Sequence, residues 1–333
     1  MAFHVFWRSN AGAAVLRDYL ETSAVPAELR IQLVNDLDAD ALLSRAQQQG
    51  MQVLIEGRPD DAWLDVPSLQ HVIVPWAGIP TALQQQMQQR PQLSLHNSHY
   101  NAPFVAQHAL ALLLACSNRI AEVDRIFRQG DWRCRNGGFP SLALRGKTCL
   151  LLGYGAIGQA LAPMLQALGM QLRVLRRHPP EDSPAGITFY SSDALLSAAS
   201  GADMLISSLP HTPQTEKLIN AEVLAALPAH ALLVNVGRGA VIDQHALYEA
   251  LEHKRLAAAG LDVWWNYPPN PEARAYTLPA DAPLHTLPQV VMSPHRADEA
   301  PEAEQARVDD VLRTLQALAR GDMRNRVDSA RGY

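Results

Sequence analysis

Short apolar runs alternate with longer polar stretches along the first hundred residues. The apolar runs cover residues 3–7, 31–34, 51–57, 69–76 and 92–97, and each has the length of a buried strand. The stretches between them are rich in alanine, leucine and glutamine, which favour helices. Strands separated by helices predict a parallel sheet with both faces covered.

A second series of strand and helix units begins at Thr148. Its predicted strands lie within residues 148–158, 171–177, 202–210, 230–239, 256–265 and 288–295. Between the two series, residues 101–132 predict one long helix, whose first half is apolar almost all round. An acidic stretch beyond His295 predicts a final helix. The pattern therefore predicts an α/β protein with two parallel-sheet domains.

The length of 333 residues fits two domains, each with its own core. A net charge of −5 gives no support for a nucleic-acid surface, and no apolar run reaches membrane-spanning length. The N-terminus has no secretion signal, so we expect a cytoplasmic protein without a nucleic-acid or membrane partner. Cys116, Cys134 and Cys149 match neither a disulfide framework nor a zinc spacing, and no metal site is expected.

A glycine motif follows the first strand of the second series. Gly153, Gly155 and Gly158 form a G-x-G-x-x-G pattern between a predicted strand and a predicted helix. The first glycine makes the tight turn, the second allows the backbone to approach a pyrophosphate, and the third lets the helix pack closely. In this context the motif predicts a dinucleotide site at the helix N-terminus.

The next strand ends in Arg176 and Arg177. An acidic residue about twenty positions after the glycines would bind a ribose 2′-hydroxyl, whereas an arginine suits a 2′-phosphate. The pair therefore favours NADP(H) over NAD(H) as the cofactor. The alternative is two solvent-facing arginines with no ligand.

Two further residues at predicted strand ends suit the chemistry of an oxo acid. Arg238 leaves the strand in "LLVNVGRG", and its planar fork matches a carboxylate. His295 follows "VVMSP" and is a candidate proton donor to a carbonyl oxygen. Ligands of open α/β sheets bind at the carboxyl ends of the strands, so both side chains are expected at one site.

The motifs "GYGAIG", "SLPHTPQTEKLI", "LLVNVGRGAVIDQHALYEAL", "AAAGLDV" and "VVMSPH", in this order and spacing, resemble the D-isomer-specific 2-hydroxyacid dehydrogenase family. The resemblance covers nearly the whole chain. "VPWAGI" at residues 74–79 is similar to the substrate-carboxylate loop of the family, and "NAPFVAQHALALLLA" is similar to its crossover and dimer helix. The double arginine resembles the NADP-preferring glyoxylate reductases within the family.

The resemblance implies two Rossmann-like or flavodoxin-like parallel-sheet domains with a cleft between them. Residues 1–99 and 297–333 would form the substrate-binding domain, and residues 100–296 the dinucleotide-binding domain. The chain would cross between them at hinges near residues 97–101 and 294–296. A homodimer formed through the nucleotide domains is also implied.

The resemblance further implies roles for individual residues. Arg238 would bind the carboxylate and the carbonyl oxygen of a 2-oxo acid, and His295 would protonate that oxygen as a hydride arrives. The substrate-binding set would be Trp76, Ala77, Gly78 and Asn101. The cofactor-binding set would be Gly153, Gly155, Ala156, Ile157, Gly158, Arg176, Arg177, Pro210, His211, Thr215, Val236, Gly237 and Asp262.

One position departs from the family pattern. Five residues past Asp262, where the family has a glutamate that pairs with the catalytic histidine, this chain has Tyr267. A neutral phenol raises the pKa of an imidazole far less than a carboxylate does. His295 is therefore expected to titrate near the ordinary value of about 6.5, or lower if buried. The alternatives are a carboxylate from Glu272, Asp298 or Glu299 in place of the glutamate, and a packing role for Tyr267.

The sequence is thus interpreted as that of an NAD(P)-dependent D-2-hydroxyacid dehydrogenase or 2-oxoacid reductase, with NADP(H) favoured. A formate-dehydrogenase-like enzyme is one alternative, which the absence of that group's glutamine at position 267 disfavours. The other alternative is an NAD(P)H-sensing binding protein on the same fold, with catalysis weakened by Tyr267.

Overall fold

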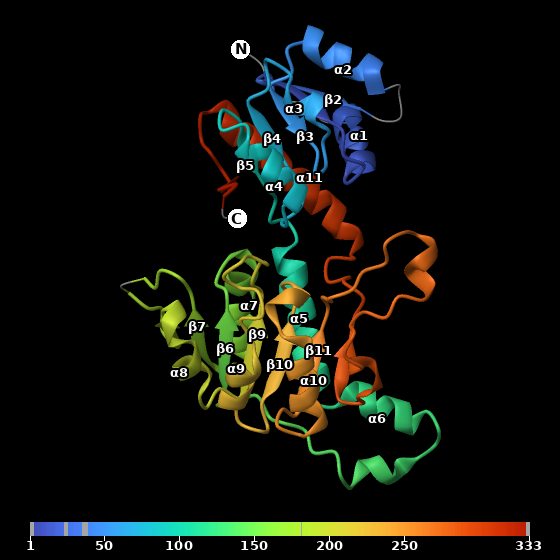
Figure 1. The fold of residues 1–333 in the computed structure, drawn as a ribbon, viewed down its shortest axis with the longest axis vertical. Coiled ribbons are helices and arrows are strands. Elements are labelled where there is room, and N and C mark those ends of the chain that lie inside the picture. Colours follow the sequence, from blue (N-terminus) through green and yellow to red (C-terminus); the bar gives the residue numbers. More distant parts are fainter. Residues whose placement is uncertain (1–2, 23–25, 35–38, 181, 331–333) are drawn as a thin grey trace. The chain divides into compact units, whose positions relative to one another are not determined.

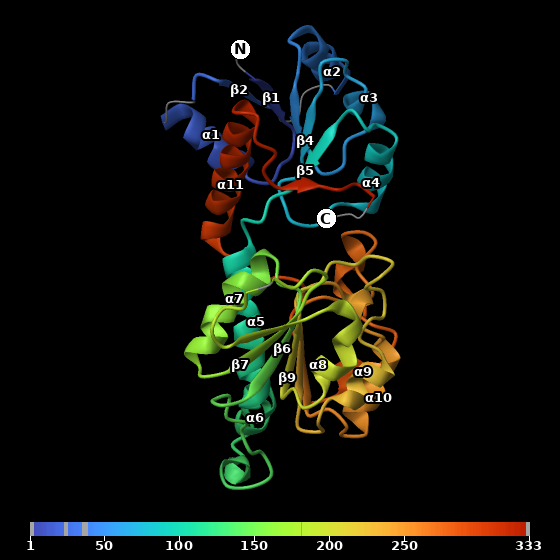
Figure 2. The same ribbon diagram turned by 90° about the vertical axis from the view of Figure 1, so that its left-hand side faces the viewer.

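The computed structural model describes every residue except 1–2, 23–25, 35–38, 181 and 331–333. The chain divides into two compact units, one formed by Met1–Asn101 with Glu299–Tyr333 and the other by Ala102–Asp298. It therefore crosses from one unit to the other twice. Each unit is a parallel sheet with helices on both faces (Figures 1 and 2), which confirms the predicted α/β fold class.

In its described residues, the first unit has a six-stranded sheet in the order β13-β5-β4-β3-β1-β2, in which only β13 is antiparallel to its neighbour. Helices α1 and α11 cover one face, and α2, α3 and α4 cover the other (Figure 2); apolar side chains of each group pack on the sheet. The strands are β1 Phe3–Trp7, β2 Leu29–Leu33, β3 Val53–Ile55, β4 His71–Ile73, β5 Ser94–His96 and β13 Arg326–Val327. The helices are α1 Ala13–Thr22, α2 Ala39–Gln48, α3 Asp61–Leu64, α4 Thr81–Gln88 and α11 Pro301–Ala319.

In its described residues, the second unit has a seven-stranded parallel sheet in the order β12-β11-β10-β9-β6-β7-β8. α5 and α7 cover one face, and α8, α9 and α10 cover the other (Figure 2). The strands are β6 Thr148–Leu152, β7 Gln171–Leu175, β8 Ile187–Tyr190, β9 Met204–Ser207, β10 Leu232–Asn235, β11 Ala258–Leu261 and β12 Val290–Met292. The helices are α5 Ala102–Ser117, α6 Ile120–Phe127, α7 Ala156–Ala167, α8 Leu195–Ala199, α9 Ala221–Ala226 and α10 Gln244–Glu252.

The prediction of one long helix over residues 101–132 is wrong. Arg119 has a φ of 54°, in the left-handed region, and the chain bends by 59° between α5 and α6. A 3-10 turn, Trp132–Arg135, follows α6. Ile120, Phe127 and Trp132 leave large apolar side chains exposed along this segment. The homodimer implied by the resemblance stays a prediction.

The apolar character of α5 has a direct structural explanation. Its side chains pack between α7 and strands β10 and β11 in the core of the second unit. Within the described part of the chain, no single helix is long and apolar enough to cross a membrane, and only the bent pair α5–α6 passes that test by length and composition.

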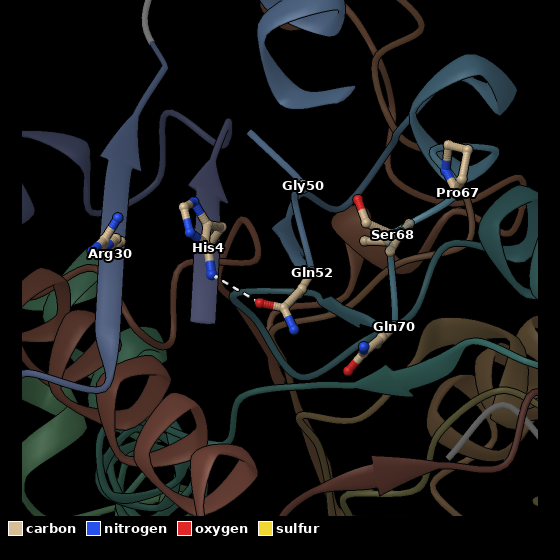
Figure 3. A pocket seen from close by; sticks show the side chains of 8 residues that line it. His4, Arg30, Gly50, Gln52, Pro67, Ser68 and Gln70 are labelled. Atoms are coloured by element: carbon tan, nitrogen blue, oxygen red, sulfur yellow. Dashed lines mark hydrogen bonds between the residues drawn. The ribbon is translucent and has the colours of Figure 1, made fainter. Parts of the chain in front are cut away.

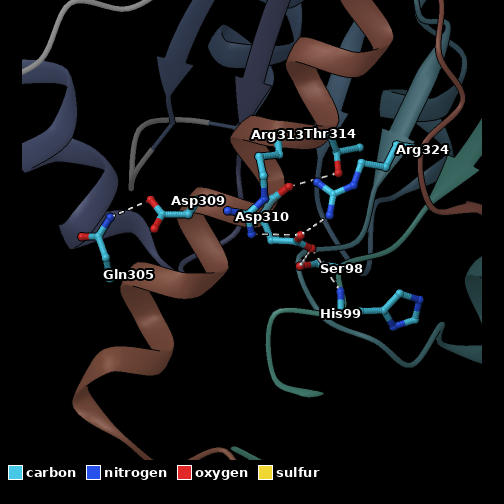
Figure 4. Close-up of polar contacts among 8 residues, drawn as sticks. All are labelled: Ser98, His99, Gln305, Asp309, Asp310, Arg313, Thr314 and Arg324. Atoms are coloured by element: carbon cyan, nitrogen blue, oxygen red, sulfur yellow. Dashed lines mark hydrogen bonds and ion pairs between the residues drawn. The ribbon is translucent and has the colours of Figure 1, made fainter. Parts of the chain in front are cut away.

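In the first unit, Asp310 of α11 anchors the segment that follows β5 (Figure 4). Its carboxylate accepts hydrogen bonds from Ser98 Oγ at 2.6 Å and from the His99 backbone N–H at 3.1 Å. Arg324 forms an ion pair with the same carboxylate at 2.7 Å. Burial acts to raise the pKa of Asp310, but these hydrogen bonds and Arg324 outweigh it and hold the pKa below its usual value. The chain is therefore held to α11 just before it leaves the unit.

Candidate active site

The glycine loop joins β6 to α7. Gly153 has a φ of 96°, which glycine adopts without strain, and a Cβ on Gly158 would lie 2.4 Å from the carbonyl oxygen of Gly153. A Cβ on Gly155 would meet no atom within 4 Å, so the space beside it is open. Ala156 and Ile157 begin α7, whose first-turn N–H groups favour an anion. These features fit the pyrophosphate of a dinucleotide.

Arg176 and Arg177 directly follow β7, the strand next to β6. The N–H of Gly153 donates to the carbonyl oxygen of Leu175 at 3.3 Å, so the arginines leave the sheet beside the glycine loop. Both arginine side chains are exposed. Two cations therefore lie at the strand end where a dinucleotide fold binds the ribose of the adenosine.

Of the remaining predicted cofactor residues, Asp262 directly follows β11, and the others follow β9 and β10 at the same carboxyl edge of the sheet. Thr215 Oγ1 donates to the carbonyl oxygen of Pro210 at 2.7 Å and closes the turn that contains the exposed His211. Val236 and Gly237 are buried, and a Cβ on Gly237 would lie 2.4 Å from the carbonyl oxygen of Leu209. Glycine is therefore required where the two loops touch.

Arg238 extends from the loop after β10. Its Nη1 donates to the carbonyl oxygen of Gly237 at 2.7 Å, and among the described residues no carboxylate lies within ion-pair distance of its guanidinium. A Cβ on Gly239 would lie 2.3 Å from the carbonyl oxygen of Trp264. The loop that carries Arg238 is thus in close backbone contact with the segment after β11. Most of the guanidinium N–H groups of Arg238 remain available to an anion.

Tyr267 and His295 are directly hydrogen-bonded. Tyr267 Oη lies 2.9 Å from His295 Nδ1, and the same oxygen accepts a hydrogen bond from the Trp264 backbone N–H at 3.2 Å. Since Trp264 is the donor in its bond, the phenol proton is free to point at Nδ1. The neutral imidazole then carries its own proton on Nε2. Tyr267 therefore sets the orientation of the ring and leaves Nε2 for a substrate.

The electrostatic surroundings of this pair favour the neutral imidazole. Burial lowers the pKa of His295 below its usual value, Arg238 lowers it further, and Asp262 and Asp298 oppose the shift. Burial raises the pKa of Tyr267, against the opposing effects of the Trp264 N–H and Arg238. Of the alternative carboxylates, Asp298 is close enough to influence His295. No described hydrogen bond or ion pair joins Glu272 or Glu299 to His295.

Asp262 supports the loop that carries His295. Only 1% of its surface is exposed, and its carboxylate accepts hydrogen bonds from Ser293 Oγ and from the backbone N–H groups of Arg296 and Ala297. His108 Nε2, from α5, lies 2.9 Å from Ser293 Oγ and 3.4 Å from the Asp262 carboxylate. Neither His108 nor Ser293 has a predicted role from the sequence. A single histidine within a nearly all-apolar helix, and the serine two positions before His295, were the available signals.

In the first unit, Trp76, Ala77 and Gly78 form the loop after β4. The Trp76 ring packs directly on Gly57, where a Cβ would lie 2.0 Å from the ring. Asn97 Nδ2 donates to the carbonyl oxygen of Ala77 at 2.8 Å. No described residue accepts a hydrogen bond from the N–H groups of Ala77 and Gly78, which leaves them available to an anion. Asn101, the last predicted substrate residue, directly precedes α5.

A cavity of about 580 Å³ opens in the first unit at the amino ends of β1 to β4 (Figure 3). His4, Arg30, Gln52 and Gln70 line it, and none of the predicted site residues does. Ligands of α/β sheets bind at the opposite, carboxyl edge. The cavity is therefore not part of the candidate active site.

Comparison with known proteins agrees with this geometry. The family described as "D-isomer specific 2-hydroxyacid dehydrogenase, NAD binding domain" matches residues 110–297. D-3-phosphoglycerate dehydrogenase of Mycobacterium leprae is 32% identical over 318 residues, which cover 94% of this chain and 56% of that protein. The chain thus spans only a little over half the length of this relative.

Other relatives match over a larger share of their own length. Glyoxylate reductase of Thermococcus litoralis is 33% identical over 225 residues, covering 66% of this chain and 64% of that protein. The NADPH-dependent glyoxylate/hydroxypyruvate reductase of Sinorhizobium meliloti, solved with NADP and malonate, is 29% identical with a TM-score of 0.72. That comparison covers 100% of this chain and 98% of the solved chain.

Proposed function

The chain belongs to the D-isomer-specific 2-hydroxyacid dehydrogenase family, and on that premise we propose that it reduces a small 2-oxo acid to the D-2-hydroxy acid with NADPH. The observation that supports this most directly is the hydrogen-bonded pair of Tyr267 and His295. Arg238, a cation without a described carboxylate partner, is close enough to lower the pKa of that histidine. An anion-binding fork next to a proton donor is the arrangement that a 2-oxo acid requires.

Each residue then has a defined task. Arg238 binds the substrate carboxylate with paired N–H groups and orients the carbonyl. The free N–H groups of Ala77 and Gly78 provide carboxylate-binding donors in the first unit. The loop from Gly153 to Gly158 would hold the cofactor, which when bound would supply a hydride for the carbonyl carbon. The protonated imidazolium of His295 gives its Nε2 proton to the carbonyl oxygen, and the ring is left neutral with its remaining proton on Nδ1, which donates to Tyr267 Oη.

The direct test is NADPH oxidation in the presence of glyoxylate, hydroxypyruvate, pyruvate and phenylpyruvate. We expect steady-state turnover on at least one of them. Turnover of formate with NADP⁺, and of no 2-oxo acid, would instead support the formate-dehydrogenase alternative. Tight NADPH binding without turnover of any of these acids would support a sensing role and would contradict the proposed reaction.

We expect the enzyme to prefer NADPH because Arg176 and Arg177 leave the sheet beside the glycine loop. A charged hydrogen bond to a 2′-phosphate contributes about 1.5–3 kcal/mol, or about a 10- to 100-fold difference in kcat/KM. Arg176→Asp or Arg177→Asp should lower the ratio of kcat/KM for NADPH to kcat/KM for NADH by about the same factor. The NADH value is the internal control, since it should change little. Equal efficiency with both cofactors in the unmodified protein would overturn the preference.

The phenol beside His295 has a predictable effect on the pH profile. Reduction needs the protonated imidazole, so kcat/KM falls as the pH rises through the pKa of His295. Burial and Arg238 already lower that pKa. Tyr267→Glu introduces a negative charge on the segment that contacts His295 and so favours the charged ring. The pH at which kcat/KM falls should therefore rise by about one unit or more.

Tyr267→Gln is the matched control, because it has nearly the same size as the glutamate variant and carries no charge. Its falling limb should stay near that of the unmodified protein. The measurement is kcat/KM for 2-oxo acid reduction against pH, which reads the free-enzyme pKa. If both variants have the same falling limb, position 267 is not coupled to His295 and Asp298 becomes the carboxylate to examine.

A further inference from the structure

His295 has a backbone conformation that side chains rarely adopt. Its φ is 53°, in the left-handed region, and Pro294 precedes it. Such a conformation persists only where the surroundings impose it, and the cost is greater for a residue that is not glycine. The contacts that impose this conformation therefore also determine where the imidazole points.

The contacts come from one buried carboxylate. Asp262 Oδ1 accepts from the Arg296 N–H at 3.0 Å, and Oδ2 accepts from the Ala297 N–H at 3.2 Å. These two N–H groups belong to the residues directly after His295. Burial acts to raise the pKa of Asp262, but the nearby His108 and the hydrogen bonds from Ser293 and Arg296 outweigh it and lower the pKa, so the group is held as a carboxylate. The backbone on the C-terminal side of His295 is thus bound to a fixed anion.

Two side chains hold the carboxylate and the other side of the loop. Ser293 Oγ donates its only proton to Asp262 Oδ1 at 2.5 Å. His108 Nε2 lies 2.9 Å from Ser293 Oγ and 3.4 Å from Asp262 Oδ1. Since the serine proton is already given to the carboxylate, its oxygen must accept from an N–H on His108 Nε2. The order of donation is therefore His108 to Ser293 to Asp262.

His108 comes from a different element than the loop it supports. It lies on α5, six residues after the first crossing between the units, whereas Ser293 and His295 lie just before the second crossing. Only 26% of its side chain is exposed, and α5 packs against β11 and β12. His108 thus joins α5 by a hydrogen bond to the loop that carries His295.

We infer that His108 is a positioning residue for His295, which acts through Ser293 and Asp262 to hold the loop in its left-handed conformation. The role is distinct from simple packing because it depends on a donated hydrogen bond. A variant that keeps the volume but not the donor should displace the imidazole, and one that keeps the donor should not. The activity arm of the test rests on the proposed function, and the second arm does not.

The first arm compares His108→Leu with His108→Gln, whose amide nitrogen reaches to nearly the same point as Nε2. His108→Leu should lower kcat for 2-oxo acid reduction by about 10- to 100-fold, the scale of a small misplacement of a reacting group, with little change in the dissociation constant of NADPH. His108→Gln should restore most of kcat. Gln107→Leu, on the exposed side of the same helix, is the matched control and should resemble the unmodified protein.

The second arm observes His295 in the free protein. Nitrogen NMR of the histidine rings, with the His295 signals assigned by their loss in His295→Asn, reports the tautomer directly. We expect the Nε2–H form in the unmodified protein and in His108→Gln, and a mixture of tautomers in His108→Leu, because the displaced ring loses Tyr267.

The outcomes separate the two ideas. Absence of turnover in the unmodified protein would contradict the proposed function, and the tautomers would still decide the role of His108. Unchanged tautomers in His108→Leu would overturn the inference. Equal losses of kcat in His108→Leu and His108→Gln would also overturn it, because the donor would then not matter.

Discussion

His295→Ala is expected to lower kcat for 2-oxo acid reduction by about 10²- to 10⁴-fold, the range that a positioned general acid contributes. In the proposed mechanism the carbonyl oxygen acquires negative charge as the hydride arrives, and the imidazole neutralises that charge by donating a proton. Alanine leaves the oxygen to take its proton from water. Steady-state rates at saturating NADPH and oxo acid measure the loss.

His295→Asn controls for the backbone, because asparagine accepts the left-handed conformation better than alanine does. If the loss reflects the missing acid, both variants should lose a similar factor, and both should bind NADPH like the unmodified protein by fluorescence titration. A large loss in His295→Ala together with near-normal turnover in His295→Asn would show that loop conformation, and not proton donation, is the role of this position.

The sheet of the second unit could be predicted from the sequence because its signals are local. The glycine motif lies between an apolar strand and a helix, and the spacing alone requires the tight turn and close approach seen at Gly153 and Gly158. Strand β8, Ile187–Tyr190, was not predicted. Its run of four residues at the edge of the sheet is short and only partly buried, so it gives a weak pattern.

The break after α5 could not be predicted for a different reason. Residues 101–132 have helical composition throughout, and the chain bends only because Arg119 takes a left-handed conformation. The tertiary structure then places α6 and the turn that follows it at a new angle. Helix propensities summed over the segment do not indicate a break that depends on the conformation of a single residue.

The sequence names candidate site residues but gives no information on the contacts between them. Counting from Asp262 gave Tyr267 as the residue at the glutamate position, but the 2.9 Å bond to His295 Nδ1 and the donor from Trp264 depend on how the loops fold over one another. Asp262 was expected along the path of the cofactor. Its described hydrogen bonds go to Ser293 and to the loop after His295, a partnership between residues more than thirty positions apart.

Arg238→Ala should both raise the KM for the oxo acid and lower kcat, with a fall in kcat/KM of about 10²- to 10³-fold. That factor corresponds to the loss of charge-assisted, paired hydrogen bonds to a partly buried carboxylate, about 3–4 kcal/mol. Loss of a contact that stabilises the bound substrate and the transition state equally would change KM alone. Loss of a group that also orients the carbonyl in the transition state lowers kcat as well. Initial rates over a range of oxo acid concentrations separate the two.

The same substitution should also shift the pH profile, because Arg238 lowers the pKa of His295. Without the cation the imidazolium is less disfavoured, its pKa rises, and the falling limb of reduction should move to higher pH. Arg238→Lys keeps the positive charge and loses the planar fork, so its KM should rise while its falling limb stays near that of the unmodified protein. A falling limb that moves equally in both variants would mean that the geometry of position 238, and not its charge, sets the titration of His295.

If Arg238→Ala has an unchanged KM, the substrate carboxylate binds elsewhere. The free N–H groups of Ala77 and Gly78 would then be the first place to look.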